Sequence, residues 1–499
     1  MAKILRQAKC CHRCILRFFD CRNNSLYFYT EKELQLVFDH LLHQSSQSAS
    51  PTCTACLGCF QYAGDDTTIL QPICAKLKQE QYETDSFALV VTVPISMNHR
   101  DHLLKLHVQD QLDKQASKSK IETGLDRWKK FGIRDAKDLY RSITGRELER
   151  TSCLQYNPDS AFHIKLTLEH PATESEHLFL TQVKDPVLRV RKVKKKGMTH
   201  TIGDSRQNIS EALNALTPED AHALTTIPPT PPKERCILSN ISMHHDSAYT
   251  GGRYLKLSRE CSQTPWVVRG KKLADMSVSG CIMDVFKKYH RCDDLKFVTA
   301  GREDANVRML GTGRPFYFEV VNPRHPILST EECVQIEKEI NTCSSSHVVQ
   351  VRNIQQIKRE DTQIIKQGEE FKRKTYQALV WFSEPLTQDI LDRCNEKGSQ
   401  EFVTAQNTPV RVFQRRGAAI REKTIHHLTL RKAEEVKDTH LGIVTMNTQA
   451  GTYIKEFVHG DLGRTLPNLA TIAGVKAADL IELDVLEVDL EWPPSSHVV

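Results

Sequence analysis

The pattern of apolar and polar residues predicts short strands and helices in the first part of the chain. Residues 162–169 (FHIKLTLE) alternate strictly between apolar and polar side chains, as in a strand with one buried face. Residues 87–94 (FALVVTVP) are mostly apolar, which predicts a buried strand. Residues 101–112 have the apolar spacing of a short amphipathic helix. We therefore expect α+β structure in this part of the chain.

Strands recur in the second part of the chain, with helical stretches between them. The predicted strands are 316–321, 375–382, 441–447 and 483–490. This alternation favours a large mixed sheet with helices packed on it. Gly451 ends one strand, and the apolar residues that follow have helical spacing: Ile454, Phe457, Val458 and Leu462.

Two segments of biased composition separate these parts. Residues 189–196 (RVRKVKKK) hold six basic residues in eight, which is typical of a solvated linker, of phosphate contacts or of a nuclear-import signal. Residues 225–234 (TTIPPTPPKE) hold four prolines in ten, which predicts an extended linker. We place the domain boundary over 225–236, between 1–224 and 237–499.

Composition narrows the class of protein. The 499 residues are enough for two or three domains, and 39% hydrophobic with 26% charged residues describes a soluble globular chain. No apolar run approaches the roughly 20 residues that span a bilayer, so we expect no membrane contact. The first residues, MAKILRQAKCCHRC, lack the apolar stretch of a signal peptide. The 16 cysteines therefore favour reduced thiols with some metal binding over disulfides.

Paired cysteines near the start predict a structural zinc site. Cys11 and Cys14 form one C-x-x-C pair, Cys53 and Cys56 form a second, and 38 residues separate the pairs. Zinc favours four tetrahedral thiolates, and such a set leaves no open position for a catalytic water. Four neighbours could replace one of these ligands: Cys10, Cys21, Cys59 and His12.

The stretch TAGREDANVRMLGTGRPFYFEV (299–320) places an aspartate among arginines. Asp304 lies between Arg302 and Arg308 in a glycine-bounded loop, just before an apolar, aromatic strand. Such a loop is often a solvated surface turn. The alternative is a catalytic acid in a pocket for an anionic polymer, and these residues alone leave both interpretations open.

Three further stretches favour the catalytic interpretation. KTYQALVWF (374–382) places Tyr376 at the start of a strand, and TQAGTYIKEFVHGDLGRTLPNL (448–469) places Tyr453 and Lys455 at a glycine turn into a helix. VRVFQRRGAAIREK (410–423) carries Arg411, Arg415, Arg416 and Arg421.

Together with GGRYLKLSRECSQTPW (251–266), these stretches resemble the archaeal and eukaryotic tRNA pseudouridine synthases that have an N-terminal THUMP-containing region. The resemblance implies a zinc-binding, THUMP-containing RNA-binding region over 1–224. It implies a pseudouridine synthase domain over 237–499, with a mixed, largely antiparallel central sheet. The implied enzyme is an isomerase that uses one aspartate, structural zinc and no organic cofactor.

The resemblance also implies a substrate, an oligomeric state, RNA partners and a cellular location. The family converts uridine to pseudouridine in the T-arm of tRNA, at position 55, position 54 or both, and flips the base out of its stack. We expect a monomer that binds tRNA, and other structured RNAs, in the nucleus and cytoplasm.

By the same resemblance, each matching residue has an expected role. Asp304 is the catalytic aspartate, and Lys455 pairs with it and keeps it ionised. The expected substrate-binding residues are Tyr376, which stacks on the uracil, Tyr453, which lines the pocket, Arg302 and Arg308, which hold flanking phosphates, and Arg415 and Arg416. The loop RVFQRRG departs from the family pattern at Gln414 and Gly417.

Two other functions compete with this interpretation. A non-catalytic RNA-binding adaptor that retains the fold would not need Asp304, Tyr376 and Lys455 in register. A zinc-dependent base deaminase needs H-x-E followed by P-C-x-x-C, and the sequence has no such signature.

Overall fold

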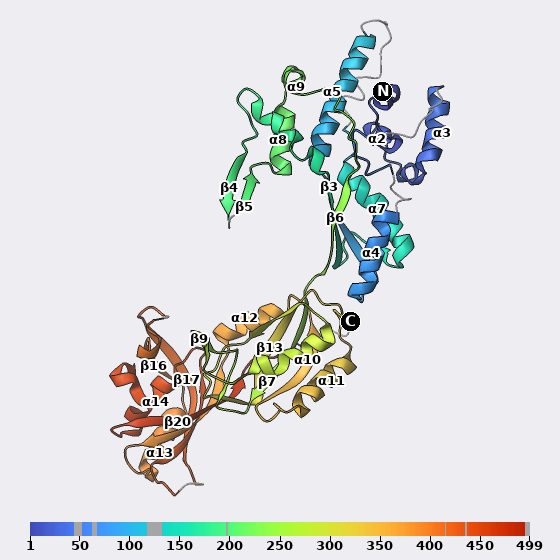
Figure 1. The fold of residues 1–499 in the computed structure, drawn as a ribbon. Coiled ribbons are helices and arrows are strands. Elements are labelled where there is room, and N and C mark those ends of the chain that lie inside the picture. The colour runs from blue at the N-terminus through green and yellow to red at the C-terminus, as the bar shows by residue number, and fades with distance from the viewer. Residues whose placement is uncertain are drawn as a thin grey trace. The chain divides into compact units, whose positions relative to one another are not determined.

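The structure is a computed structural model that describes residues 1–43, 52–61, 67–116, 132–195, 198–414, 416–434 and 437–494. The chain forms two compact units, Met1–His244 and His245–Val499 (Figure 1). Each unit has a hydrophobic core of its own. Among the helices of the described residues, none combines the length and the apolar character needed to cross a bilayer.

A four-stranded sheet forms the centre of the first unit, in the order β2-β1-β3-β6. β1 (Ser86–Thr92) pairs in parallel with β2 (Gln155–Tyr156) and β3 (Phe162–Glu169), and β6 (Ile237–His245) completes the edge. In β3 the apolar residues are buried and the polar residues are more exposed, so the predicted alternation is confirmed.

Helices surround this sheet in the first unit (Figure 1). The α-helices are α1 (Ala2–Gln7), α2 (His12–Phe18), α3 (Glu31–Leu42), α4 (Thr67–Glu80), α5 (Ser96–Ala116), α7 (Ala136–Ser152), α8 (Arg206–Ala215) and α9 (Pro218–Leu224). The 3-10 helices are η1 (Asn24–Phe28), η2 (Pro171–Thr173) and η3 (Glu176–Gln182). α5 contains the predicted helix 101–112 and extends beyond it at both ends.

The two segments of biased composition also lie in the first unit. The basic run starts an antiparallel hairpin of β4 (Arg191–Lys195) and β5 (Met198–Ile202), and its last residue, Lys196, lies outside the described residues. The Pro-rich segment has no regular secondary structure. Arg100 donates to the carbonyl of Thr230 at 3.1 Å, which fastens this segment to the first unit.

A ten-stranded mixed sheet forms the second unit. Its path is β14-β7-β13-β20-β15-β18-β17-β16-β19, with β12 paired to β13. The pairing of β13 with β20 is parallel, and the other pairs of this sheet are antiparallel. The mixed sheet expected from the sequence is therefore confirmed. The bounds of its strands are β7 (Ala248–Lys256), β12 (Asp294–Thr299), β13 (Arg308–Val321), β14 (Val349–Ile357), β15 (Lys374–Phe382), β16 (Phe402–Asn407), β17 (Ile420–Lys432), β18 (Leu441–Thr448), β19 (Thr465–Leu466) and β20 (Ala478–Val488).

Helices cover both halves of this sheet (Figure 1). α10 (Val278–His290) and α11 (Thr330–Thr342) pack beside β12 and β14, and α12 (Thr362–Phe371) packs on β13. α13 (Gln388–Gly398), α14 (Ile454–His459) and α15 (Leu469–Ala473) pack on the half that contains β16, β17 and β20. Short elements complete the unit: β8 (Cys261–Ser262), β9 (Val267–Val268), β10 (Lys271–Lys272), β11 (Met276–Ser277), η4 (Val410–Val412) and η5 (Gly460–Gly463).

The helix predicted after Gly451 is shorter than its apolar spacing indicates. α14 ends at His459, because Gly460 adopts a φ of 77°. Asp461 and Leu462 follow with positive φ, and the Leu462 side chain is 94% exposed. Placing Leu462 on the buried face of the helix was therefore wrong.

Candidate functional site

The Asp304 loop connects the antiparallel strands β12 and β13. Gly301, with a φ of 89°, turns the chain out of β12, and a Cβ atom there would lie 3.1 Å from the side-chain nitrogens of Arg314 and Lys374. A side chain at this position would therefore combine an unfavourable backbone conformation with crowding. The turn leaves the Asp304 side chain 52% exposed.

Cations from two other segments face the Asp304 carboxylate. Lys455 Nζ donates to Asp304 Oδ2 at 2.8 Å, and Arg411 Nη1 lies 3.9 Å from the same oxygen. Burial of the loop opposes ionisation, but the hydrogen bond from Lys455 and the charges of Lys455, Arg411 and Arg302 outweigh it. They hold the pKa of Asp304 below its ordinary value, so the group is a carboxylate at neutral pH.

Lys455 reaches Asp304 because the start of α14 is held by β16. The Tyr453 N–H donates to Gln406 Oε1 at 2.9 Å, and Gln406 Nε2 donates back to the Tyr453 carbonyl at 2.9 Å. The Tyr453 hydroxyl accepts from Arg416 Nη1 at 3.1 Å. The structure thus brings Lys455 to Asp304 and Arg416 to Tyr453, whereas Arg415 lies outside the described residues.

Arg411 and Glu456 are neighbours of this site to which the sequence analysis gave no role. Glu456 is buried on α14, with 2% of its side chain exposed, and Arg411 Nε donates to Glu456 Oε1 at 2.8 Å. This hydrogen bond raises the pKa of Arg411, so its cation is retained beside Asp304. The sequence signal was present, because Arg411 stands in the arginine-rich stretch 410–423.

Tyr376 occupies the third position of β15 and packs against the core of the second unit. Burial raises its pKa to about 12, so its ring carries a neutral hydroxyl at any physiological pH. The charges that act on this hydroxyl are those of Arg314, which lies in β13, and of Glu303, which directly precedes Asp304 in the loop.

The two arginines that flank Asp304 differ in their surroundings. Arg302 is exposed and adds to the positive charge around the carboxylate. Arg308 instead forms a bidentate ion pair with Asp484 of β20, at 2.9 Å and 2.6 Å. Its guanidinium therefore joins β13 to β20, and the structure does not bring it to Asp304.

A cleft of about 260 Å³ opens beside Lys455. His459 of α14, Asn306 of the Asp304 loop and the start of β20 line its walls. Lys455 thus both bonds to the Asp304 carboxylate and lines this polar cleft, whose walls also include the acidic Asp479 and Glu482.

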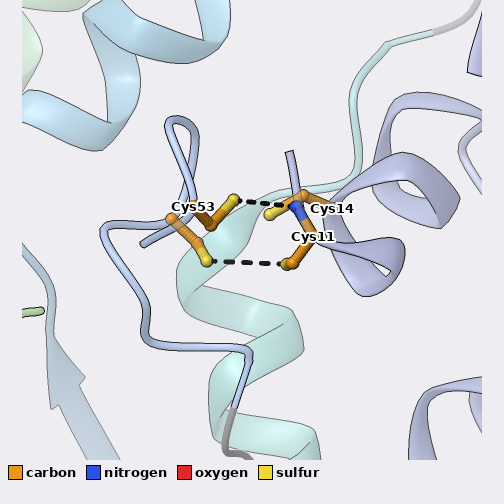
Figure 2. A group of neighbouring side chains, drawn as sticks. Cys11, Cys14 and Cys53 are labelled. Atoms are coloured by element: carbon orange, nitrogen blue, oxygen red, sulfur yellow. Dashed lines mark hydrogen bonds between the residues drawn. The ribbon is translucent and has the colours of Figure 1, made fainter. Parts of the chain in front are cut away.

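The four predicted cysteines form a second candidate site, in the first unit. The sulfur atoms of Cys11, Cys14, Cys53 and Cys56 all lie within 4.8 Å of one another, and the four residues are buried. Cys11 and Cys14 lie at the start of α2, and Figure 2 shows the side chains of Cys11, Cys14 and Cys53 directed toward a common centre.

This donor set fits a tetrahedral metal ion. Zinc–thiolate bonds of about 2.3 Å place neighbouring sulfurs about 3.8 Å apart. The Cys11 and Cys56 sulfurs are 3.8 Å apart. The Cys11 N–H donates to Cys53 Sγ at 3.2 Å, and Arg17 Nη1 donates to Cys14 Sγ at 3.4 Å, contacts that favour thiolate over thiol.

Two of the four alternative ligands, His12 and Cys59, have other partners. His12 Nδ1 lies 2.6 Å from Glu31 Oε1, and Cys59 Sγ lies 2.7 Å from Cys236 Sγ. Neither these residues nor Cys10 and Cys21 belong to the group that could hold a metal among the described residues.

Comparison with known proteins covers nearly the whole chain. Residues 249–489 match the family described as Pus10, C-terminal, and residues 53–243 match eukaryotic Pus10, N-terminal. The tRNA pseudouridine synthase Pus10 of Homo sapiens is 33% identical over 451 residues, which cover 90% of this chain and 80% of the human protein.

An archaeal relative and a solved structure match part of the chain. The tRNA pseudouridine synthase Pus10 of Methanopyrus kandleri is 37% identical over 257 residues, or 49% of this chain and 57% of that protein. A crystal structure of a Cbf5–Nop10–Gar1 complex matches with 15% identity and a TM-score of 0.26, over 47% of each chain. That score is too low to carry an argument about this chain.

Proposed function

The chain belongs to the Pus10 family of tRNA pseudouridine synthases, and we propose that it isomerises uridine in the T-arm of tRNA with Asp304 as its catalytic carboxylate. The modified nucleotide is position 55, position 54 or both. The observation that carries this proposal is the ionised, half-exposed Asp304 carboxylate, which is held by Lys455, a residue that lines a polar cleft.

The reaction rearranges bonds without adding or removing atoms. The bond from the sugar carbon C1′ to N1 of uracil breaks, the base rotates, and C5 bonds to C1′. C5 then loses its proton and N1 gains one. Asp304 acts either as a nucleophile on the sugar or base, or as a base that deprotonates the sugar, and both routes need a carboxylate. Its lowered pKa supplies that form at neutral pH.

The neighbours of Asp304 support this chemistry in three ways. Lys455 aims the carboxylate and keeps it ionised, and the buried Glu456 holds Arg411 beside it. Tyr376 presents a neutral ring on which the flipped uracil stacks, a contact typically worth about 1–3 kcal/mol. Tyr453 lines the pocket.

The exposed arginines bind the RNA around the target. Arg302 occupies the space that the flipped base leaves, and Arg416, held by the Tyr453 hydroxyl, contacts a phosphate. We assign no RNA contact to Arg308, because its guanidinium is engaged by Asp484.

We further propose that the first unit is a THUMP-containing module that binds the tRNA and is stabilised by a structural zinc ion. The four cysteines hold zinc as a structural ion, since four sulfur ligands leave no position for water. A cleft of about 380 Å³ opens where the parallel strands β1 and β3 end, and its lining holds Arg206 and His170 together with the carboxylates of Glu169, Glu174 and Asp204. Carboxyl ends of parallel strands are frequent ligand sites, which supports binding of an RNA end there.

The test compares wild-type protein with Asp304→Asn on an unmodified tRNA transcript. Pseudouridine is mapped at single-nucleotide resolution, and tRNA binding is measured in parallel. We expect modification in the T-arm by the wild type, and binding without modification by the variant. Asp438→Asn is the matched control, because Asp438 is exposed and its described partner is His440. Binding by the wild type without any modification would instead indicate an RNA-binding adaptor.

A further inference from the structure

Buried side chains hold the main chain of the Asp304 loop from beneath. Arg314 Nη1 donates to the Ala300 carbonyl at 2.7 Å, and Gln263 Nε2 donates to the Gly301 carbonyl at 3.0 Å. Lys256 Nζ donates to the Asp304 carbonyl at 3.0 Å and to the Ala305 carbonyl at 2.8 Å. Four carbonyls of this short loop thus bond to three side chains, named here the donor set (Lys256, Gln263 and Arg314).

Lys256 is the member of the donor set that contacts Asp304 itself. It is the last residue of β7, and its side chain is 0% exposed. Its ammonium donates to three carbonyl oxygens, those of Cys261, Asp304 and Ala305. It forms no ion pair with a carboxylate of the described residues, and burial lowers its pKa.

The neighbouring carboxylate, Glu303, attracts this ammonium through space, but its oxygens bond to other groups. Glu303 Oε2 accepts from Arg314 Nε at 2.7 Å, and both Glu303 oxygens accept from the Tyr254 hydroxyl. Arg314 and Glu303 are themselves buried, so their charges cancel as a pair. Among the described residues, the direct partners of the Lys256 ammonium are therefore main-chain carbonyls.

A buried ammonium without a directly bonded carboxylate is costly to a fold. Removing such an ion from water costs several kcal/mol even after relaxation, and a methionine would fill the same space without that cost. The three carbonyl contacts offset part of the cost. Two of these carbonyls, those of Asp304 and Ala305, belong to the Asp304 loop, and the third belongs to Cys261 of β8. This is the pattern of a group that fixes the main chain of the loop.

We propose that Lys256 is a positioning residue that sets the location of Asp304 by fixing its carbonyl and that of Ala305. The inference rests on the proposed role of Asp304 as the catalytic carboxylate. Lys256 does not touch the substrate. It determines where the Asp304 carboxylate meets the flipped uridine, and a displacement of about 1 Å in such a group costs about 100-fold in rate.

Two substitutions separate the hydrogen bonds from the charge. Lys256→Met removes both, whereas Lys256→Gln keeps two N–H donors and loses the charge. Single-turnover pseudouridine formation at saturating tRNA, the Kd for tRNA and the thermal midpoint are measured for each variant. Lys76→Met is the matched control, because Lys76 also donates to a main-chain carbonyl, that of Ile241 in the first unit, at 2.7 Å.

We expect Lys256→Met to lower the single-turnover rate about 100-fold while the Kd for tRNA changes less than about twofold. Lys256→Gln should recover about 10-fold of that loss, and Lys76→Met should keep the wild-type rate. A purely structural lysine would lower the thermal midpoint but leave the rate of the folded protein unchanged.

Three outcomes would overturn the proposal: a wild-type rate in folded Lys256→Met, equal rates in the Met and Gln variants, or failure of both variants to fold. If Lys256→Met alone fails to fold, the rate of Lys256→Gln decides, and a wild-type rate there contradicts the proposal. Wild type and Asp304→Asn are run in the same assay. If the wild type is inactive or Asp304→Asn is active, the proposed function fails instead of this inference.

Discussion

Replacing Lys455 with methionine should shift the acid limb of the reaction to higher pH. In the wild type, the hydrogen bond and charge of Lys455 contribute to the lowered pKa of Asp304. The substitution removes this contribution, and the charges of Arg411 and Arg302 remain. More of the Asp304 population is then protonated at mildly acidic pH, and the protonated acid can serve neither as nucleophile nor as base.

The magnitude follows from the geometry of the pair. Lys455 Nζ and Asp304 Oδ2 are 2.8 Å apart, and Asp304 is 52% exposed. Even at the dielectric constant of water, about 80, two unit charges at this separation interact by about 1.5 kcal/mol. One pKa unit corresponds to about 1.4 kcal/mol, so the pKa of Asp304 should rise by about one unit or more.

The assay is single-turnover release of the uracil C5 hydrogen from a tritium-labelled tRNA transcript, between about pH 3 and pH 8, so that the range includes the acid limb of the wild type. We expect the acid limb of Lys455→Met to lie about one pH unit above that of the wild type. A loss of rate in Lys455→Met that persists at neutral pH, where Asp304 is ionised in both proteins, measures how much Lys455 contributes to the orientation of the carboxylate. Lys288→Met is the control, since Lys288 pairs with the distant Glu339 and is 65% exposed. Coincident acid limbs in wild type and Lys455→Met would refute the reasoning.

Three further predictions concern the metal, the arginines and a buried histidine. Cys14→Ser should release bound metal and lower the thermal midpoint of the first unit, as seen by metal analysis and circular dichroism, and unchanged metal content would contradict the zinc site. Arg302→Ala should weaken tRNA binding and reduce the slope of log binding constant against log salt concentration by about one, whereas Arg308→Ala should lower stability with little change in that slope. Binding titrations at several salt concentrations measure both slopes. Equal slopes in the two variants would count against the assignment. Burial lowers the pKa of His290 in the folded protein to about 4, whereas in the unfolded chain this histidine binds a proton as pH falls below about 6.5. Between these two values the proton stabilises the unfolded chain only, so the free energy of unfolding should drop by about 3 kcal/mol by pH 4. Denaturant unfolding of His290→Gln should lack that share of the pH dependence, and an unchanged dependence would rule it out.

The sequence predicted best those features that depend on local pattern. Strict alternation located β3, and the two C-x-x-C pairs identified the cysteines that come together, because each pair is a short-range turn. The apolar spacing around Phe457 located α14 as well. Its end was missed because a left-handed conformation at Gly460 stops the helix although the apolar spacing continues to Leu462.

The sequence could not reveal the long-range pairing of charges. The resemblance implied that Arg308 holds a phosphate, and the sequence could not show its ion pair with Asp484, which is 176 residues away. Lys256 and Glu456 received no role in the sequence analysis, since burial of a lysine or glutamate is rare and only the packed structure shows it. Arg411 was visible as part of an arginine-rich stretch, but its place beside Asp304 depends on Glu456.

The position of β20 has a consequence for how the protein is made. β20 is the last described strand of the second unit, yet it lies in the middle of the sheet, parallel to β13 and antiparallel to β15. Asp304 lies in the loop before β13, on one side of β20. Tyr376 lies in β15, on the other side of β20, and Lys455 lies in α14, later in the chain than β15. A nascent chain that has emerged only as far as β19 has both halves of the pocket but no strand to join them. A chain truncated before Ala478 would thus leave the facing edges of β13 and β15 without their partner strand. Such open edges are surfaces that chaperones and proteases can recognise.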